Sequence, residues 1–214
     1  MKTTNKNTVQ NDLTEIVFIL DRSGSMAGYE EDTIGGFNAA MAEQRGKEGR
    51  VLVSTLLFDN ETAVLHDRLP LEDIPTMTRQ DYRVGGCTAL LDAIGGAIHH
   101  IGNIHKYARA EDVPERTLFL ITTDGQENAS SRYDSATVKK MIERQREKYG
   151  WEFIFLAANI DAVETAKSMG IREDRTGSFE QTPEGVRANY ERMCEVITTV
   201  RCRKSLDDGT WRKN

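Results

Sequence analysis

The chain has 214 residues, and that length fits one domain of ordinary to large size. Hydrophobic residues make up 38% of it and charged residues 29%, a balance typical of a globular protein with a core and not of a disordered chain. The net charge is −6, from 28 basic and 34 acidic residues, and no basic cluster stands out, which argues against binding to nucleic-acid phosphates. The longest apolar runs, such as Ile16–Leu20, are far too short to span a bilayer, and no membrane partner is expected.

Two further features concern the cellular compartment. The first residues, Met1–Asp12, are polar and lack the apolar core of a signal peptide. The three cysteines, Cys87, Cys194 and Cys202, are an odd number without metal-type spacing, which suits a reducing environment better than a disulfide framework. We therefore expect a cytoplasmic protein.

Five segments have the pattern of strands. The first is the continuous apolar run Ile16–Leu20, which is typical of a strand covered on both faces. Val51–Phe58 is rich in Val and Leu, and the short segment Thr62–Leu65 is expected to pair with it as a hairpin, giving an antiparallel edge. Thr117–Thr123 and Trp151–Ala158 are two further predicted strands.

Helical patterns lie between these strands. Apolar residues in Thr88–Ala110 recur at steps of three and four positions, which forms one buried face. Asp32–Arg45 contains Gly35 and Gly36, and each glycine costs a helix about 1 kcal/mol relative to alanine. We therefore expect this helix to pack closely on the sheet. The remaining predicted helices are Ser135–Tyr149, Asp161–Met169 and Pro183–Val200.

Strands that alternate with helices predict a mostly parallel sheet with helices on both faces. The predicted fold class is therefore α/β, doubly wound and Rossmann-like, in one domain over residues 13–200. We expect a flexible N-terminal segment over residues 1–12 and a polar C-terminal tail, residues 201–214, that frays.

Oxygen-bearing side chains follow two of the predicted strands and one loop. The first strand ends in Asp21-Arg22-Ser23-Gly24-Ser25, the strand that ends at Thr123 is followed by Asp124, and a Gly-rich loop leads through Thr88 into a helix. In doubly wound domains, ligands bind just beyond the carboxyl ends of the strands. The candidate metal ligands are Asp21, Ser23, Ser25, Thr88 and Asp124.

The chemistry of these residues favours a hard divalent cation. Carboxylate and hydroxyl oxygens suit Mg²⁺, Mn²⁺ or Ca²⁺ rather than zinc or copper. Asp21 and Asp124 would neutralise the charge of such an ion, and the three hydroxyls would add coordination without further charge. The cation would stay electrophilic and open to one more oxygen from outside. We expect Mg²⁺, although the sequence does not distinguish it from Mn²⁺ or Ca²⁺.

Taken together, these three elements resemble the metal-ion-dependent adhesion site of von Willebrand factor A (VWA) domains. That site has the pattern Asp-x-Ser-x-Ser, then a threonine, then an aspartate, and here Asp21, Ser23, Ser25, Thr88 and Asp124 match it in order. The resemblance covers roughly residues 14 to 200 and is closest to intracellular single-domain members of bacterial or phage type. It implies a six-stranded sheet with one short antiparallel edge strand. It also implies that the hydroxyls touch the metal, the aspartates act directly or through water, and a partner carboxylate completes the shell.

Polar residues in the flanking loops are candidates for partner selectivity, because loops on a rigid scaffold carry recognition. These rim residues are Arg22, Tyr29, Glu30, Glu31, Arg83, Gln126, Glu127 and Asn128. Asn159 and Asp161 either border the same face or cap the next helix.

Several of these residues have plainer interpretations. Thr88 is a candidate helix N-cap as well as a ligand. Cys87, at the same helix start, is either a redox-sensitive thiol or, as we favour, a small neutral filler. His99, His100 and His105 share one predicted helix but lack the i, i+4 spacing of a zinc pair.

Three functions are compatible with these residues. The favoured one is a non-enzymatic protein-binding module that recruits an acidic side chain of a partner to a bound cation. A Mg²⁺-dependent phosphoester hydrolase with Asp21 as its nucleophile is the second, but Ser23 stands where such enzymes usually have another acidic residue. The third is a structural subunit of an intracellular complex.

Overall fold

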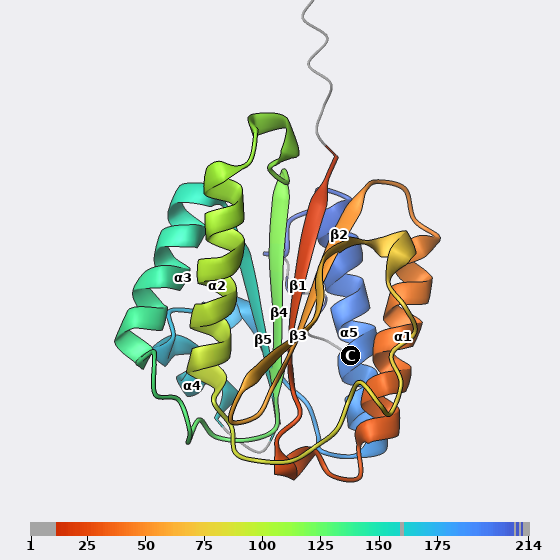
Figure 1. Cartoon of the computed structure of the whole chain (residues 1–214), viewed down its shortest axis with the longest axis vertical. Coiled ribbons are helices and arrows are strands. Elements are labelled where there is room, and N and C mark those ends of the chain that lie inside the picture. Colours follow the sequence, from red (N-terminus) through yellow and green to blue (C-terminus); the bar gives the residue numbers. More distant parts are fainter. Residues whose placement is uncertain (1–11, 159–160, 208, 210, 212–214) are drawn as a thin grey trace, which may run out of the picture.

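Six strands form one sheet in the order β3-β2-β1-β4-β5-β6 in the computed structural model of the chain (Figure 1). The structure describes residues 12–158, 161–207, 209 and 211, so the predicted flexible segment up to residue 11 lies outside the described residues. The strands are β1 (Thr14–Asp21), β2 (Val51–Phe58), β3 (Thr62–Pro70), β4 (Arg116–Thr123), β5 (Glu152–Ala157) and β6 (Thr176–Ser178). The five predicted strands are therefore confirmed.

The centre of the sheet is β1, which pairs in parallel with β2 on one side and β4 on the other. All eight residues of β1 are buried, as its continuous apolar run predicts. β3 pairs antiparallel with β2, which confirms the predicted edge hairpin. It runs to Pro70 rather than ending at Leu65, because two register shifts against β2 let the pairing continue past an irregular stretch.

The sixth strand, β6, was implied by the family resemblance but by no segment of the sequence pattern. Thr176–Ser178 has three residues and pairs in parallel with β5 at the other edge. A strand this short has too few residues to display an alternation of apolar and polar side chains.

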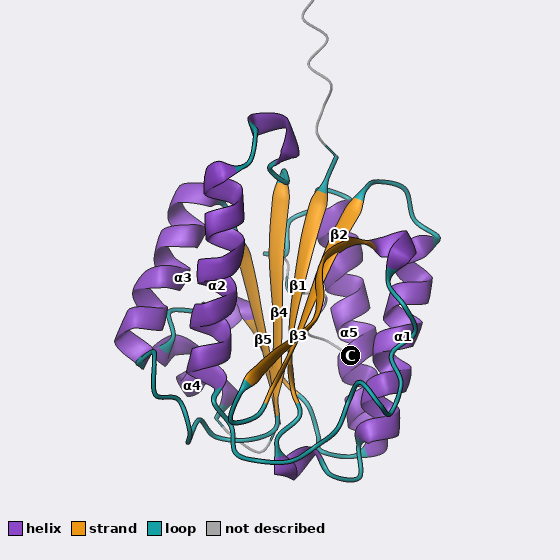
Figure 2. Ribbon diagram, viewed as in Figure 1, coloured by secondary structure: helices purple, strands orange, loops and turns teal. Residues whose placement is uncertain are grey.

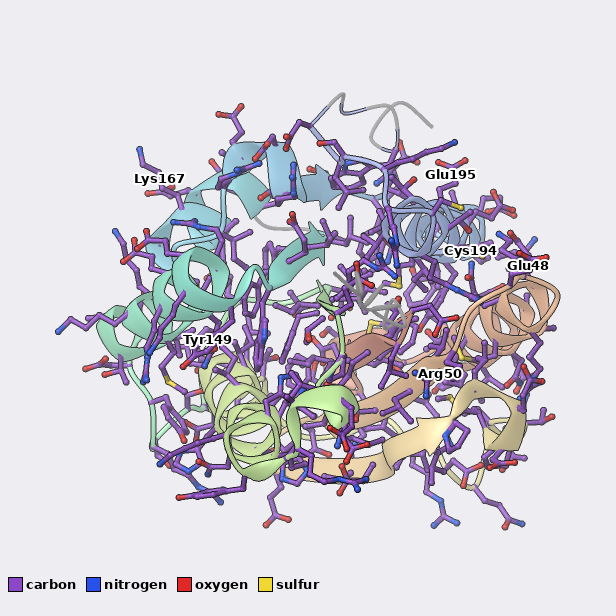
Figure 3. All side chains as sticks on the ribbon, turned by 90° about the horizontal axis from the view of Figure 1, so that it is seen from above. Glu48, Arg50, Tyr149, Lys167, Cys194 and Glu195 are labelled. Carbon is purple, nitrogen blue, oxygen red and sulfur yellow. The ribbon has the colours of Figure 1, made fainter. Side chains whose placement is uncertain are left out.

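Helices cover both faces of the sheet (Figure 2). One face packs under α1 (Glu30–Arg45) and α5 (Pro183–Arg201). The other packs under α2 (Leu90–Tyr107), α3 (Ser135–Tyr149) and α4 (Ala162–Ser168). Figure 3 looks onto the end where β1 begins and shows α1 beside α5 on one side, with α2 and α3 on the other. None of the helices in the described ranges is long and apolar enough to cross a membrane.

The glycines of α1 serve a different contact from the one expected. A Cβ on Gly36 would lie 2.5 Å from the ring of Tyr190, so this glycine lets α1 approach α5 and not the sheet. A Cβ on Gly35, the preceding residue, would have no heavy atom within 4 Å. The helix does pack on the sheet, where Phe37 lies edge-on to Phe18 of β1. Gly36 does not serve that contact, because it lies on the side of α1 that faces the neighbouring helix.

This pair of glycines gives a matched test of the α1–α5 contact. We expect Gly36→Ala to lower the melting temperature, because Tyr190 is buried and its ring must shift to admit a methyl group. We expect Gly35→Ala to raise stability by up to about 1 kcal/mol, since alanine favours the helix and meets no atom. Thermal denaturation of both variants measures this, and a loss of equal size in both would contradict it.

Part of the predicted C-terminal tail is packed. Leu206 and Trp211 are 3% and 2% exposed and belong to the core on the α1–α5 side of the sheet. The expectation of a fraying tail does not hold at these two residues, because each is a large apolar side chain within reach of an apolar surface.

Candidate metal centre

The candidate ligands lie at the carboxyl ends of two neighbouring central strands. β1 ends at Asp21, and Asp124 directly follows β4. These strands are adjacent in the sheet and run parallel. The chain continues from β1 to β2 on one side and from β4 to β5 on the other. This is the point in a doubly wound sheet at which loops diverge and leave room for a ligand. In Figure 1 the loops after β1 and β4 meet at the lower end of the sheet.

Asp21 is held rigidly. It is 1% exposed; its Oδ1 accepts the Ser23 backbone N–H at 2.7 Å, and its Oδ2 accepts the Thr123 hydroxyl at 2.6 Å. The buried hydroxyl of Tyr82 donates to the Asp21 carbonyl at 2.5 Å. The side chain therefore cannot rotate without breaking two hydrogen bonds.

Ser25 connects the first loop to Asp124. Its hydroxyl donates to Asp124 Oδ1 at 2.6 Å, and its Oγ lies 3.1 Å from that of Ser23. Because the Ser25 proton is directed to the carboxylate, Ser25 Oγ accepts from the Ser23 hydroxyl and keeps one lone pair that can face a cation. The two serines and Asp124 therefore already form one cluster of oxygens.

The loop with Thr88 lies against the first loop. Gly24 N–H donates to Gly86 O at 3.1 Å, and Gly85 N–H donates to Arg22 O at 2.9 Å. A Cβ on Gly24 would lie only 3.3 Å from Gly86 O, and Gly86 itself has a φ of +75°, so glycine suits both positions. These contacts bring Thr88 to the cluster.

Thr88 has the features of a ligand and not of a cap. The residue is 3% exposed, and its hydroxyl has no hydrogen-bond partner within the described ranges. Helix α2 begins at Leu90 with Ala89 at its N-cap position, so the N-cap interpretation of Thr88 is wrong. The first N–H groups of α2 are instead bound from another loop, by Glu127 Oε2 at 2.9 Å from Leu91 N and by Ser130 Oγ at 3.0 Å from Asp92 N.

The space between these oxygens is kept open by Gly125. A Cβ added there would lie 3.3 Å from Thr88 Oγ1 and 3.5 Å from Ser25 Oγ. A side chain at this position would therefore occupy the space beside both hydroxyls. A hydroxyl without a hydrogen-bond partner, next to a glycine that leaves it uncovered, fits a bound ion.

Both carboxylates carry an electrostatic cost. Burial raises the pKa of Asp21, and burial together with the nearby charge of Asp21 raises the pKa of Asp124. Neither side chain forms a salt bridge to any residue that the structure describes. Two buried carboxylates without a counter-charge are a natural place for a cation.

The donor set decides which ions fit. The described residues contain no group of three or more His, Cys, Asp or Glu side chains that could hold a metal, so zinc-type coordination has no support there. Two carboxylates with three hydroxyls are instead all-oxygen donors, which hard cations such as Mg²⁺ accept. The residues present therefore fit a divalent cation of that class.

The predicted rim residues differ in how far they are available to a partner. Arg83 and Gln126 are exposed, whereas Arg22 pairs with Asp59 at 3.0 Å. Glu30 accepts the Gly28 N–H at 2.7 Å, and Glu127 accepts hydrogen bonds at both of its carboxylate oxygens. The other contacts are from Glu31 to Arg79, from Tyr29 Oη to Gln181 O and from Asn128 Oδ1 to Thr88 N.

Four of the remaining sequence candidates have contacts in the structure. Asp161 accepts the Glu164 N–H at 2.9 Å and caps α4, while Asn159 lies outside the described residues. Cys87 is exposed, and its N–H donates to Asn60 Oδ1. His100 contacts Asp67, and His105 contacts Glu15.

Sequence reasoning missed two residues of the site, Thr123 and Gln181. The position of Thr123 directly before Asp124 at a strand end was a usable signal, since hydroxyls near a site fix the carboxylates. Gln181 lies 57 positions from Asp124, which it contacts, and no spacing pattern could have indicated it.

Comparison with known families agrees with this geometry. The sequence matches the family model described as VWA domain containing CoxE-like protein over residues 6–159, which is more than half of the chain. The chain belongs to the VWA family. Comparison with curated proteins gives no significant match.

Solved structures resemble this VWA domain in fold. The vWF domain of the type V pili tip protein Mfa5 from Porphyromonas gingivalis is 10% identical with a TM-score of 0.62, over 91% of this chain and 98% of that one. The D319A mutant of the PilB minor pilin from Streptococcus sanguinis is 11% identical with a TM-score of 0.60, over 87% of this chain and 62% of that one. The von Willebrand factor type A protein from Catenulispora acidiphila is 14% identical with a TM-score of 0.55, over 85% and 41%. This chain spans less than two thirds of the length of the last two, and at such identities the similarity shows the fold alone.

Proposed function

We propose that this VWA domain is a protein-binding module that acts through a bound divalent cation, with Mg²⁺ as the first candidate. The observation that carries the proposal is the convergence of Ser25, Thr88 and Asp124 around the open space beside Gly125. Asp21 and Ser23 complete the oxygen set from the same loop.

Each residue has a distinct part in this proposal. The hydroxyls of Ser23, Ser25 and Thr88 would contact the ion, while Asp21 and Asp124 would neutralise its charge directly or through water. A bound cation would supply an electrophilic position that accepts a carboxylate oxygen from a partner. The exposed residues Arg83 and Gln126 lie in the loops around that position and would contact the partner.

We propose that the module is not an enzyme. A nucleophilic carboxylate needs a free oxygen and access to its substrate. Asp21 is 1% exposed, and both of its oxygens accept hydrogen bonds. Binding and not attack is the role that this environment supports. We also propose a cytoplasmic location, on the composition and cysteine content of the sequence.

The first test is direct cation binding with a matched pair of variants. We expect purified protein to bind Mg²⁺ in a calorimetric titration, and Ser25→Ala to weaken that binding at least about tenfold by removing one ligand and one hydrogen bond to Asp124. Gln126→Ala, an exposed change in the neighbouring loop, is the control and should bind Mg²⁺ as the wild type does.

The second part of the test concerns the partner. Immobilised wild-type protein should retain specific proteins from a lysate in Mg²⁺ and release them in EDTA, with mass spectrometry as the readout. The Ser25→Ala variant should not retain them in either buffer. Retention that is the same in Mg²⁺, in EDTA and with Ser25→Ala would count against a cation-dependent function.

A further inference from the structure

Gln181, in the loop between β6 and α5, lies directly against the candidate metal centre. It is beyond the part of the chain that the VWA family model matches, which ends at residue 159. Its side-chain amide nitrogen donates to Asp124 Oδ2 and, at 2.9 Å, to the backbone carbonyl of Ser25. One amide therefore joins the loop after β1 to the residue after β4.

The carboxylate of Asp124 is thereby held from both sides. Oδ1 accepts the Ser25 hydroxyl at 2.6 Å, and Oδ2 accepts the Gln181 amide. With both bonds in place, the plane of the carboxylate is fixed relative to Ser25. If the amide were absent, the carboxylate could rotate about its Cβ–Cγ bond, since it would retain a single side-chain donor.

Two contacts fix the backbone at Gln181. The hydroxyl of Tyr29, at the start of α1, donates to the Gln181 carbonyl at 2.7 Å. The next residue, Thr182, is the N-cap of α5 and accepts the Gly185 N–H at 3.0 Å. The amide therefore projects from a fixed backbone position and not from a loose loop.

We infer that Gln181 is a positioning residue of the metal centre. Its amide orients Asp124 for the cation, and through it cation binding stabilises the start of α5. The inference rests on the proposed cation-binding function. Side chains that hold a metal-binding carboxylate in place contribute about 10- to 100-fold to metal affinity. The alternative is that the amide competes with the cation for Asp124, and this predicts the opposite sign.

The test uses Gln181→Met, which preserves the length of the side chain and removes its N–H groups. Its control is Gln80→Met, the same exchange at an exposed position in the segment between β3 and α2. Calorimetric titration with Mg²⁺ should give an affinity about tenfold weaker for Gln181→Met and unchanged for Gln80→Met. Tyr29→Phe, which removes only the anchor of the Gln181 carbonyl, should lose less than Gln181→Met.

A second readout separates positioning from a general loss of structure. Hydrogen exchange of the Gly185 and Val186 amides, which both bond to Thr182, should slow when wild-type protein is saturated with Mg²⁺. In Gln181→Met at saturating Mg²⁺ this slowing should be absent, while the melting temperature in EDTA stays near that of the wild type.

The outcomes distinguish this inference from the proposed function. If wild-type protein binds no divalent cation, both fail. If wild type binds Mg²⁺ but Gln181→Met binds it equally or more tightly, the inference alone is overturned. Exchange that slows equally in both proteins would also overturn it, because Mg²⁺ binding would then stabilise the start of α5 without Gln181.

Discussion

Replacing Asp21 with asparagine is expected to abolish the stabilisation of this protein by Mg²⁺ while raising the stability of the metal-free form. Burial raises the pKa of Asp21, so its charged form is costly when no cation is present. Asparagine is nearly isosteric and removes that charge. Its Oδ1 can still accept the Ser23 N–H, and the Thr123 hydroxyl can turn to Gly125 O, which lies 3.2 Å away.

The wild-type protein should respond to Mg²⁺ in the opposite way. At a Mg²⁺ concentration a hundred times the dissociation constant, binding stabilises the folded state by about 2.7 kcal/mol. For a chain of this size that corresponds to a rise of roughly 5–11 °C in melting temperature. Differential scanning calorimetry in EDTA and in Mg²⁺ measures both effects. An equal rise with Mg²⁺ in wild type and Asp21→Asn would refute the role given to Asp21.

The same carboxylates predict a dependence on pH. Both Asp21 and Asp124 have a pKa raised above the ordinary value of 3.8 in the folded protein. The stability that protonation adds to the metal-free form is therefore complete below the unfolded-state pKa, and it is lost as the pH rises through the folded-state values. Mg²⁺ needs the charged carboxylates, so its stabilising effect should fade as the pH falls through that same range.

Replacing Glu15 with glutamine is expected to destabilise the protein strongly, although Glu15 lies away from the metal centre. Glu15 lies near the start of β1, at the other end of the strand from Asp21, and its side chain is fully buried. It accepts hydrogen bonds from Arg68 Nε at 2.5 Å and from His105 Nε2. The contacts join β1 to β3 and to the last turn of α2, while the ring of His105 lies edge-on to Trp151.

The expected loss follows from an uncompensated charge. Removing one partner of a buried ion pair costs about 3–5 kcal/mol. Because the Arg68 side chain is 19% exposed and keeps part of its hydration, we expect a loss near the lower figure, about 3 kcal/mol. For a protein of this size that is a fall of roughly 6–12 °C in melting temperature, present in EDTA and in Mg²⁺ alike. Arg109 and Asp112 form a matched exposed pair, and Asp112→Asn should leave the melting temperature unchanged. A shift of similar size in both variants would contradict the argument.

Local patterns determined much of the fold. Ile16–Leu20 and Leu118–Ile121 are apolar throughout, and such runs in an α/β chain predict parallel strands covered on both faces. β1 and β4 have that environment. Because the carboxyl ends of parallel neighbours share one edge, the positions of Asp21 and Asp124 in the sequence were enough to predict that they lie near each other.

The sequence by itself thus determined the central strands, because their patterns lie in residues that are close in the chain. It also determined the oxygen set at their ends, because the geometry of a parallel sheet brings those ends together. Only the tertiary structure decided what lies around them. The contacts of Gln181 with Asp124, of Arg68 and His105 with Glu15, and of Tyr190 with Gly36 join residues between 53 and 154 positions apart. Such contacts depend on how whole helices and loops pack, and no local period or spacing encodes them. The oxygen set at Asp21 to Ser25 is predictable from local chemistry, but only the fold brings the Gln181 amide to Asp124 and to the Ser25 carbonyl.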